Sequence, residues 1–490
     1  MSDHHNRSHD LVAIARDAML ARGLEADFTA EALRELEGIN AERLSQASDL
    51  TDMSQRLWCS IDNDDSLDLD QITVAERLAH GQVRIFVGIA DVDARVKQGG
   101  PIDLHAQKNT TSVYTGIKIF PMLPEKLSND LTSLAEQQPR IAVIIEMDIG
   151  PSGAIEGSRI YRARVKNQAK LTYNAVAAWL DGTAELPEAA LRVPGMDEQL
   201  RVQDEVAQKM RGLRYREGAL ELETIEPRAV IEDGVVIDLK HEKKNRATEL
   251  IEDFMIAANG VTARYLNQAG SSTLRRVVRS PKRWERIVQI AEDLGDTLPG
   301  EPDSKALSEF LSRRKVVDPL RFPDLSLSIV KLLGRGEYVL EKAGQAPLGH
   351  FGLAVRDYSH ATAPNRRFPD LITQRLVKAV LSQAAAPYTD KELGFLAVHC
   401  TAQEDAADKV ERQVRKSTAA LLLEPRIGEI FEGIVTGSSE KGTWARVLAP
   451  PVEGKIIRGQ NNLDVGDRVR LKLLNVSVER GFIDFVRVER

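Results

Sequence analysis

Cysteine, aromatic residues and long apolar runs are scarce in this chain of 490 residues. Its two cysteines, Cys59 and Cys400, cannot form a disulfide framework or a structural zinc site on their own. No stretch approaches the roughly 20 apolar residues of a membrane-spanning helix, and the first ten residues lack the apolar core of a secretory signal. We therefore expect a soluble, cytoplasmic protein of a reducing compartment, monomeric and without a membrane partner.

An overall excess of positive charge is also absent, since the formal net charge is −7. By itself this value argues against a nucleic-acid partner. The charge is unevenly placed, however. Residues 51–80 carry seven Asp and Glu against two Lys and Arg, and residues 240–286 carry eleven Lys and Arg against five Asp and Glu. An acidic cluster and a basic surface together suit a metal-dependent enzyme that acts on a polyanion, although each is also typical of a solvated surface.

The first 50 residues have helical periodicity. Apolar residues recur at helical spacing over 11–24, where Gly23 is a reasonable stop, and a second short helix is expected over 28–39 with Thr29 as its N-cap. Two helices and a turn are compatible with a helix-turn-helix, but no recognition helix can be identified. A structural cap is the alternative interpretation.

The middle of the chain alternates strand and helix patterns. Short apolar runs rich in branched residues predict buried strands at 83–92 and 140–149. Helical periodicity is present in four further segments: 249–266, 284–295, 370–384 and 405–423. This alternation predicts a mixed α/β region.

Beyond Pro425 the chain consists of short, alternating strands, with turns expected at Gly437, Gly442, Gly466 and Gly481. About 65 residues of this kind fit a five-stranded OB barrel, and the block resembles the RNA-binding barrel of the ribosomal-protein S-one type. Phe431 and Trp444 are candidates for stacking on bases. Both could instead lie in the barrel core.

The most informative segment is IDNDDSLDLDQI, residues 61–72. Five carboxylates occur within nine positions: Asp62, Asp64, Asp65, Asp68 and Asp70. Because such a cluster repels itself, a hard cation such as Mg²⁺ or Ca²⁺ would stabilise it. An EF-hand is excluded, since its sixth position would be Leu67 instead of Gly and its twelfth Thr73 instead of Glu. A solvated acidic turn remains the alternative.

The cluster resembles the signature of the ribonuclease II/R family of hydrolytic exoribonucleases. Further blocks match that family in order: YTGIKIFPMLPEKLSNDLTSL (114–134), AKLTYNAVAAWL (169–180), LIEDFMIAANG (250–260) and HFGLAVRDYSHATAPNRRFPDLITQRL (350–376). The similarity covers roughly residues 51–490. It implies an α/β (α+β) nuclease domain, a C-terminal five-stranded OB β-barrel and a small α-helical N-terminal segment. The expected divisions are 1–50, 51–385, a helical connection at 386–424, and 425–490.

The resemblance implies a role for each matching residue. Asp62, Asp68 and Asp70 match aspartates that hold two Mg²⁺ ions and the scissile phosphate, with Asp70 at the most critical position, and Mn²⁺ is a plausible substitute ion. Two metals about 4 Å apart activate a water and stabilise the leaving oxygen. Arg366 matches an arginine that clamps the phosphate; a structural Arg–carboxylate pair is its alternative interpretation.

Three residues match positions that hold the RNA 3′ end. Tyr114 matches an aromatic residue that stacks near that end, and Tyr173 and Glu252 match residues that hold the terminal nucleotide and read its ribose 2′-hydroxyl. Without the family, Tyr173 would be interpreted as a core aromatic and Glu252 as an exposed helical acid.

The sequence departs from the family pattern at two site positions. Gln71 follows Asp70 where the family has a further Asp, and a neutral amide offers a metal only its oxygen. One metal site is therefore expected to be weaker unless Asp65 compensates. Leu222 stands where some relatives carry a Phe that stacks on bases, so the grip on the bases is expected to be looser.

A third departure is the length ahead of the acidic cluster, because relatives have two cold-shock domains there and this chain has about 50 residues. An open entrance is expected, which would accept single-stranded RNA and structured RNA with a 3′ overhang. The resemblance implies processive, Mg²⁺-dependent 3′-to-5′ hydrolysis to nucleoside 5′-monophosphates in RNA turnover.

The competing hypothesis is a catalytically degenerate RNA-binding protein on the same scaffold, with Gln71 as the sign of lost catalysis. Other chemistries find little support. No P-loop is present, and no serine or cysteine nucleophile elbow accompanies His350 and His360.

Overall fold

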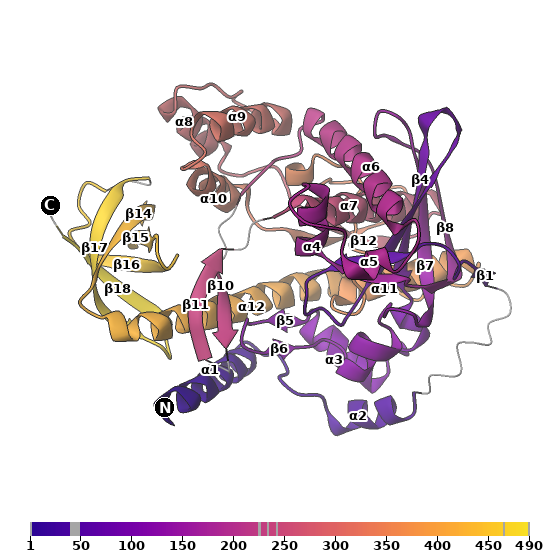
Figure 1. The fold of residues 1–490 in the computed structure, drawn as a ribbon, viewed down its shortest axis with the longest axis horizontal. Helices are drawn as coiled ribbons and strands as arrows, with labels where there is room; N and C mark the ends of the chain where they lie inside the picture. The colour runs from indigo at the N-terminus through magenta and orange to yellow at the C-terminus, as the bar shows by residue number, and fades with distance from the viewer. Residues whose placement is uncertain are drawn as a thin grey trace.

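The computed structural model describes residues 2–39, 50–223, 227–232, 235–241, 244–463 and 466–488. The predicted arrangement of N-terminal helices, a mixed helix and sheet region and a five-stranded barrel is confirmed (Figure 1). None of the helices in the described ranges combines the length and the hydropathy that crossing a membrane requires.

A seven-stranded sheet dominates the mixed region. Its strands, in spatial order, are β1 (Thr51–Asp52), β8 (Ile155–Lys166), β7 (Pro139–Ile149), β4 (Val83–Ala90), β3 (Gln71–Arg77), β2 (Cys59–Asp62) and β9 (Ala169–Thr172). The end pairs β1/β8 and β2/β9 are parallel and the other pairs are antiparallel. The predicted strands at 83–92 and 140–149 are confirmed as β4 and β7. Cys59 is fully buried in β2.

Helices cover this sheet and extend away from it. In chain order they are α3 (Pro101–Asn109), α4 (Tyr173–Leu180), α5 (Glu188–Leu191), α6 (Met196–Arg216), α7 (Arg246–Gln268), α8 (Trp284–Asp293), α9 (Ser304–Val317), α10 (Phe322–Leu333), α11 (Phe368–Leu381) and α12 (Asp390–Leu423). The helix α7 packs against β2, β4, β7 and β8. It begins at a capping box in which Asn245 and Thr248 satisfy each other's backbone N–H groups. This cap fixes where the helix begins, and therefore where Glu252 lies.

Three two-stranded ladders complete this region. They are β5 (Val113–Tyr114) with β6 (Ile119–Phe120), β10 (Pro227–Glu232) with β11 (Val235–His241), and β12 (Thr273–Val277) with β13 (Glu337–Glu341). The β5–β6 ladder carries Tyr114 and contacts α12. The backbone N–H of Tyr114 donates to Glu411 of α12 at 2.8 Å, so α12 holds the ladder in place.

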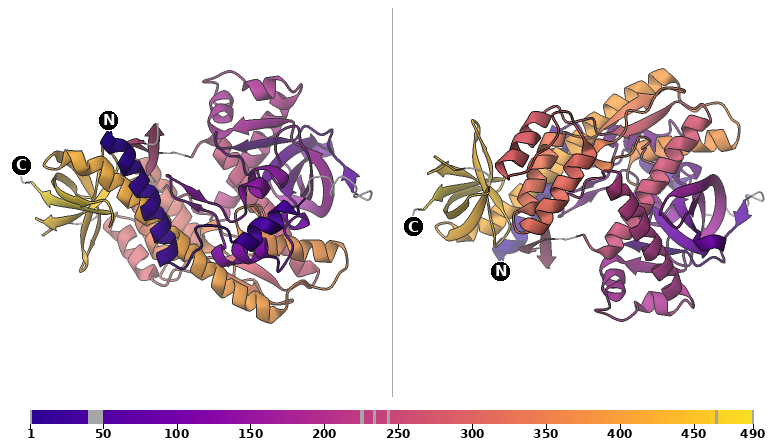
Figure 2. Two further views of the ribbon diagram at one scale, coloured as in Figure 1. Left: turned by 90° about the horizontal axis from the view of Figure 1, so that it is seen from below. Right: turned by 90° about the horizontal axis from the view of Figure 1, so that it is seen from above.

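The helix α12 begins at Asp390, ahead of the periodic segment 405–423, and lies within the helical connection expected at 386–424. Thr389 and Glu392 form a capping box that starts the helix there. It runs from the region of the sheet to the barrel (Figure 1), and Figure 2 shows the same course from two further sides.

The two N-terminal helices, α1 (Ser2–Ala21) and α2 (Ala30–Glu37), pack on different parts of the molecule. The first packs against α12 and the second against α3. The predicted N-cap is confirmed, since Thr29 accepts a hydrogen bond from the N–H of Ala32. These contacts agree with the interpretation of the helices as structural caps. Residues 40–49, on which the expected division at residue 50 depends, lie outside the described residues.

The C-terminal barrel is closed by β14 (Ile430–Ser439), β15 (Gly442–Val447), β16 (Glu453–Arg458), β18 (Phe482–Arg487) and β17 (Arg468–Ser477), in that spatial order. One expected turn is wrong: Gly437 lies within β14, at the place where its register with β15 shifts. A glycine in a strand pattern is typical of such a bulge as well as of a turn. Arg446 of β15 forms an ion pair with Asp324 of α10 at 2.7 Å, which joins the barrel to the helices α8–α10.

Candidate active site

The aspartate cluster follows β2 and leads directly into β3. Asp62 ends β2, and its Oδ1 accepts hydrogen bonds from the hydroxyl of Ser66 and the N–H of Asn63, both at 2.8 Å. Leu69, between the acids Asp68 and Asp70, is buried. Its N–H donates to the hydroxyl of Ser133 at 3.1 Å, so the segment crosses the core in an ordered course. A solvated acidic turn is therefore the wrong interpretation for the second half of the cluster, residues 68–70.

Asp70 is a buried carboxylate, with 2% of its surface exposed. Its Oδ1 accepts the N–H of Asn365 at 2.9 Å, and its Oδ2 lies 3.6 Å from Nε of Arg366. Burial raises the pKa of Asp70 well above its usual range, while Arg366 and the N–H of Asn365 oppose that shift. Oδ2 makes no hydrogen bond within the described part of the chain. This buried oxygen is open to a further ligand.

Asp68 is less buried than Asp70. Burial raises its pKa, and the charge of Asp62 acts in the same direction, whereas Arg366 opposes it. Its Oδ2 accepts a hydrogen bond from the hydroxyl of Tyr114 at 3.2 Å. The structure thus brings Tyr114 directly to the acidic cluster.

Arg366 reaches the cluster from a loop that is distant in sequence. Asp370 of α11 is fully buried, and its Oδ1 accepts the N–H groups of Thr362 and Ala363 at 2.8 and 2.9 Å and Nη2 of Arg367 at 2.7 Å. The carbonyl of Arg366 accepts the N–H of Ser112 at 3.0 Å. Asp370 therefore fixes the loop from behind, so that Asn365 and Arg366 meet Asp70. The side chain of Arg366 is 44% exposed and available to an anion.

Tyr173 and Glu252 reach the cavity of the cluster from α4 and α7. Tyr173 begins α4 immediately after β9, whose end is paired with Asp62. Burial raises the pKa of Tyr173, with smaller contributions in the same direction from Asp62 and Glu252. Glu252, on α7, accepts a hydrogen bond from Nζ of Lys244 at 2.6 Å.

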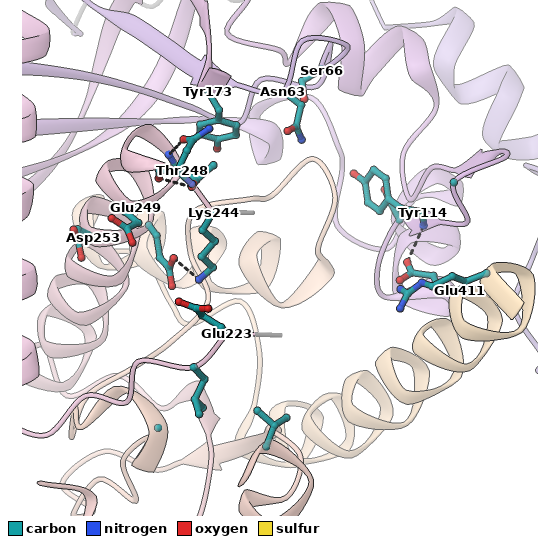
Figure 3. Close-up of a pocket in the computed structure, with 18 of the residues that line it drawn as sticks. Asn63, Ser66, Tyr114, Tyr173, Glu223, Lys244, Thr248, Glu249, Asp253 and Glu411 are labelled. Atoms are coloured by element: carbon teal, nitrogen blue, oxygen red, sulfur yellow. Dashed lines mark hydrogen bonds and ion pairs between the residues drawn. The ribbon is translucent and has the colours of Figure 1, made fainter. Parts of the chain in front are cut away.

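These residues share one cavity of about 390 Å³. Eight of the residues expected at the site line it: Asp62, Asp68, Asp70, Gln71, Tyr114, Tyr173, Glu252 and Arg366. Its volume lies within the range of about 300–1,000 Å³ that small-molecule pockets occupy. A second cavity of about 1650 Å³ shares Asp68, Tyr114, Tyr173 and Glu252 with it (Figure 3). The two cavities therefore adjoin at these residues.

The wall of the larger cavity differs from the basic surface that the charge of residues 240–286 suggested. Among the described residues, ten Asp and Glu line it against six Lys and Arg. Several of the cations are ion-paired: Arg214 pairs with Asp253, and Lys315 lies 2.7 Å from both Glu221 and Glu223. The basic residues described over 244–286 therefore do not give the described part of this wall an excess of positive charge, because sequence position does not tell which side chains meet there.

The two departures from the family pattern have defined places. Gln71 lines the smaller cavity, and its Nε2 lies 3.5 Å from Oδ2 of Asp62, so the amide stands beside the carboxylates. Asp65 is exposed and lines only the larger cavity, which gives no support to its compensating for Gln71. Leu222 lines the larger cavity and packs partly against the core of α8–α10.

The two barrel aromatics are not brought to either cavity. Phe431 is only 5% exposed and packs against Phe485 in the barrel core, so stacking on a base is wrong for it and the core interpretation is correct. Alternate residues of a strand face opposite sides, and the strand pattern alone did not tell which side faces the core. Trp444 is partly exposed, with Nζ of Lys455 5.7 Å from the centre of its ring.

Sequence reasoning missed three residues that shape the site. Asn365 donates its N–H to Asp70, Asp370 holds the loop, and Lys244 binds Glu252. The first two lie in the same block as Arg366, but no sequence pattern indicates the hydrogen bonds between backbone N–H groups and the side chains of Asp70 and Asp370. Lys244 directly precedes the N-cap Asn245, and a search for that cap would have placed it at the start of α7.

The donor set fits a divalent cation. Asp62, Asp68 and Asp70 offer hard oxygen ligands of the kind that Mg²⁺ prefers, and Oδ2 of Asp70 is buried without a hydrogen bond in the described ranges. The same ranges contain no group of three His, Cys, Asp or Glu side chains already gathered for a metal. A cation bound here would therefore draw the carboxylates together.

Comparisons with known proteins agree with this architecture. The RNB domain model matches residues 50–383, and the model of the RNase II-type exonuclease C-terminal S1 domain matches residues 429–488. Ribonuclease R of Thermotoga maritima is 29% identical over 494 residues, covering 94% of this chain and 68% of that protein. Ribonuclease R 1 of Lactococcus lactis is 28% identical over 453 residues, and this chain spans 54% of its length.

Solved structures show the same fold. The apo form of Mycoplasma genitalium RNase R superposes with a TM-score of 0.86 at 23% identity, covering 98% of this chain and 78% of that one. A structure of yeast Ssd1, a pseudonuclease, has a TM-score of 0.66 at 15% identity and covers 91% of this chain and 55% of that one. The RNB domain model matches more than half of the chain, at residues 50–383, and the chain therefore belongs to the RNB-domain family.

Proposed function

We propose that the protein is a Mg²⁺-dependent 3′-to-5′ exoribonuclease that hydrolyses single-stranded RNA processively and releases nucleoside 5′-monophosphates. The observation that carries the proposal is the shared cavity, which joins three aspartates, Arg366, two tyrosines and Glu252 at its walls. The names of the Ribonuclease R relatives support it. The small volume of this cavity, about 390 Å³, suits one nucleotide at a time, which supports release of mononucleotides.

Each residue has a defined task in this reaction. Asp62, Asp68 and Asp70 would hold Mg²⁺, which when bound supplies an activated water and stabilises the leaving oxygen. Arg366 offers its fork of N–H donors to the phosphate and offsets the negative charge that develops there. The ring of Tyr114, held by its hydrogen bond to Asp68, stacks on a base near the 3′ end.

Tyr173 and Glu252 would hold the terminal sugar. The carboxylate of Glu252 accepts a hydrogen bond from a ribose hydroxyl, and the hydroxyl of Tyr173 donates or accepts one. The 2′-hydroxyl is the group that distinguishes RNA from DNA. The larger cavity leads single-stranded RNA to this end, and RNA with a duplex and a 3′ overhang enters by the same path. Because carboxylates predominate on that wall, cations in solution would take part in RNA entry.

The test is a time course on 5′-labelled single-stranded RNA with Mg²⁺ or with EDTA. We expect shortening to a small limit product with release of mononucleotides, only when Mg²⁺ is present. RNA that stays intact in Mg²⁺ while binding is measurable would reject the proposal. That result would favour the second candidate, a degenerate RNA-binding protein, for which the observation is the neutral Gln71 beside Asp62.

The variant Gln71→Asp tests how the missing carboxylate affects the metal. We expect it to bind Mg²⁺ about tenfold more tightly, because one more anionic oxygen would face the cation. Without Mg²⁺ its melting temperature should fall below that of the wild type, since Gln71 is only 9% exposed and a charge there is costly. A Mg²⁺ binding titration measures the first effect, and thermal unfolding with and without Mg²⁺ measures the second.

Asp65→Asn is the control for this experiment. It changes one charge of the same cluster at an exposed position that does not line the smaller cavity, so its metal affinity should stay close to that of the wild type. Unchanged affinity in Gln71→Asp would show that position 71 does not contact the metal.

A further inference from the structure

Glu252 has a single described partner that fixes its carboxylate. Nζ of Lys244 donates to Oε2 of Glu252 at 2.6 Å, and the side chain of Glu252 is 42% exposed in the cavity. Within the described ranges Oε1 makes no hydrogen bond that would compete with a ligand. One oxygen is thus held and the other is open.

Asn245, which directly follows Lys244, is hydrogen-bonded to both helices that carry the residues proposed to hold the sugar, α4 with Tyr173 and α7 with Glu252. Asn245 caps α7, the helix of Glu252, through hydrogen bonds to the N–H groups of Ala247 and Thr248. Its Nδ2 also donates to Oδ1 of Asn174 at 3.1 Å, and Asn174 follows Tyr173 directly in α4. Lys244 is therefore anchored relative to Tyr173 and Glu252 together.

The side chain of Lys244 lines the larger cavity (Figure 3), and its ammonium donates to the carboxylate of Glu252. A free glutamate has several rotamers, and holding one of them reduces the entropy lost when a ligand binds.

We propose that Lys244 is a specificity-determining positioning residue, which orients Glu252 so that its free oxygen accepts the 2′-hydroxyl of the terminal ribose. This inference rests on the proposed function and adds to it the residue that sets the preference for ribose over deoxyribose. Lys244 acts through Glu252 and does not take part in the hydrolysis itself.

The test compares two 5′-labelled oligonucleotides of one sequence, all-ribo or with a single 2′-deoxynucleotide at the 3′ end. The measured quantity is the ratio of their kcat/KM values for removal of the first nucleotide. A site built to hydrogen-bond a hydroxyl discriminates strongly against its absence. In Lys244→Met, which keeps the aliphatic chain and loses the charge, we expect this ratio to fall by about tenfold.

Two further variants separate positioning from general loss of charge. Lys244→Arg keeps a cation that can reach Glu252 and should recover most of the ratio. Lys315→Met removes a cation that pairs with Glu221 and Glu223 in the larger cavity. Lys315→Met should leave the ratio unchanged even if both substrates bind less tightly.

The outcomes are distinguishable. If Lys244→Met slows both oligonucleotides equally, Lys244 serves as a phosphate contact and the inference is overturned. If the wild type removes ribo and deoxy ends at the same rate, the site does not read the 2′-hydroxyl, and the inference fails while the nuclease remains. If the wild type cleaves neither substrate, the proposed function fails and takes the inference with it.

Discussion

Replacing Asp70 by asparagine is expected to lower the rate of RNA hydrolysis by about a thousandfold or more while leaving RNA binding in place. The substitution preserves the shape of the side chain and its acceptor for the N–H of Asn365. It removes the charge and the buried oxygen that is open to a metal. A time course in Mg²⁺ and a binding titration in EDTA measure the two properties.

The same variant should be more stable than the wild type when no metal is bound. Burial raises the pKa of Asp70 well above its usual range, so the folded protein holds a proton that the unfolded chain releases above about pH 4. The wild type therefore loses stability as the pH rises from that value toward the raised pKa. Asparagine has no such proton, and its advantage should grow with pH over that window.

Mg²⁺ provides the control, because a ligand that binds only the folded state stabilises it. Adding Mg²⁺ should raise the melting temperature of the wild type and reduce or reverse the advantage of Asp70→Asn. Hydrolysis at the rate of the wild type, or a melting temperature in EDTA below that of the wild type at neutral pH, would contradict the role assigned to this carboxylate.

The parts of the site that could be predicted from the sequence are those that lie close together in the chain. Asp62, Asp68 and Asp70 occur within nine positions, and their mutual repulsion already indicates a cation. Arg366 is almost 300 residues away, and only the resemblance to a family connected it to the cluster. Its place depends on the hydrogen bonds of Asp370, which are tertiary contacts without a local pattern.

The difference between local patterns and tertiary contacts also explains which predictions from the sequence are wrong. Helix and strand periodicity predicted β4, β7 and α7 because their apolar faces pack on one core. The side of β14 that faces the core is not predictable from its pattern, so stacking on bases and burial in the barrel were both open for Phe431, which lies inside the barrel. The charge of the larger cavity was also missed, because ion pairs such as Lys315 with Glu221 and Glu223 join segments about 90 residues apart.

Replacing Asp370 by asparagine is expected to lower kcat by about 10- to 100-fold with little change in KM. Asparagine keeps one oxygen to accept the N–H groups of Thr362 and Ala363, but it no longer balances the charge of Arg367. Breaking a buried ion pair from one side typically costs about 3–5 kcal/mol. The loop that carries Arg366 should then move relative to Asp70, and misplaced transition-state contacts reduce kcat.

A matched variant separates this effect from a general loss of stability. Asp103 is 4% exposed at its side chain and forms an ion pair with Arg375 at 2.8 Å, and neither residue lines either of the two cavities described above. Asp103→Asn should lower the melting temperature as Asp370→Asn does, yet keep the kcat of the wild type. If both variants lose stability and both keep kcat, Asp370 only stabilises the fold. If kcat falls in Asp370→Asn alone, the buried carboxylate is what holds Arg366 against the reacting phosphate.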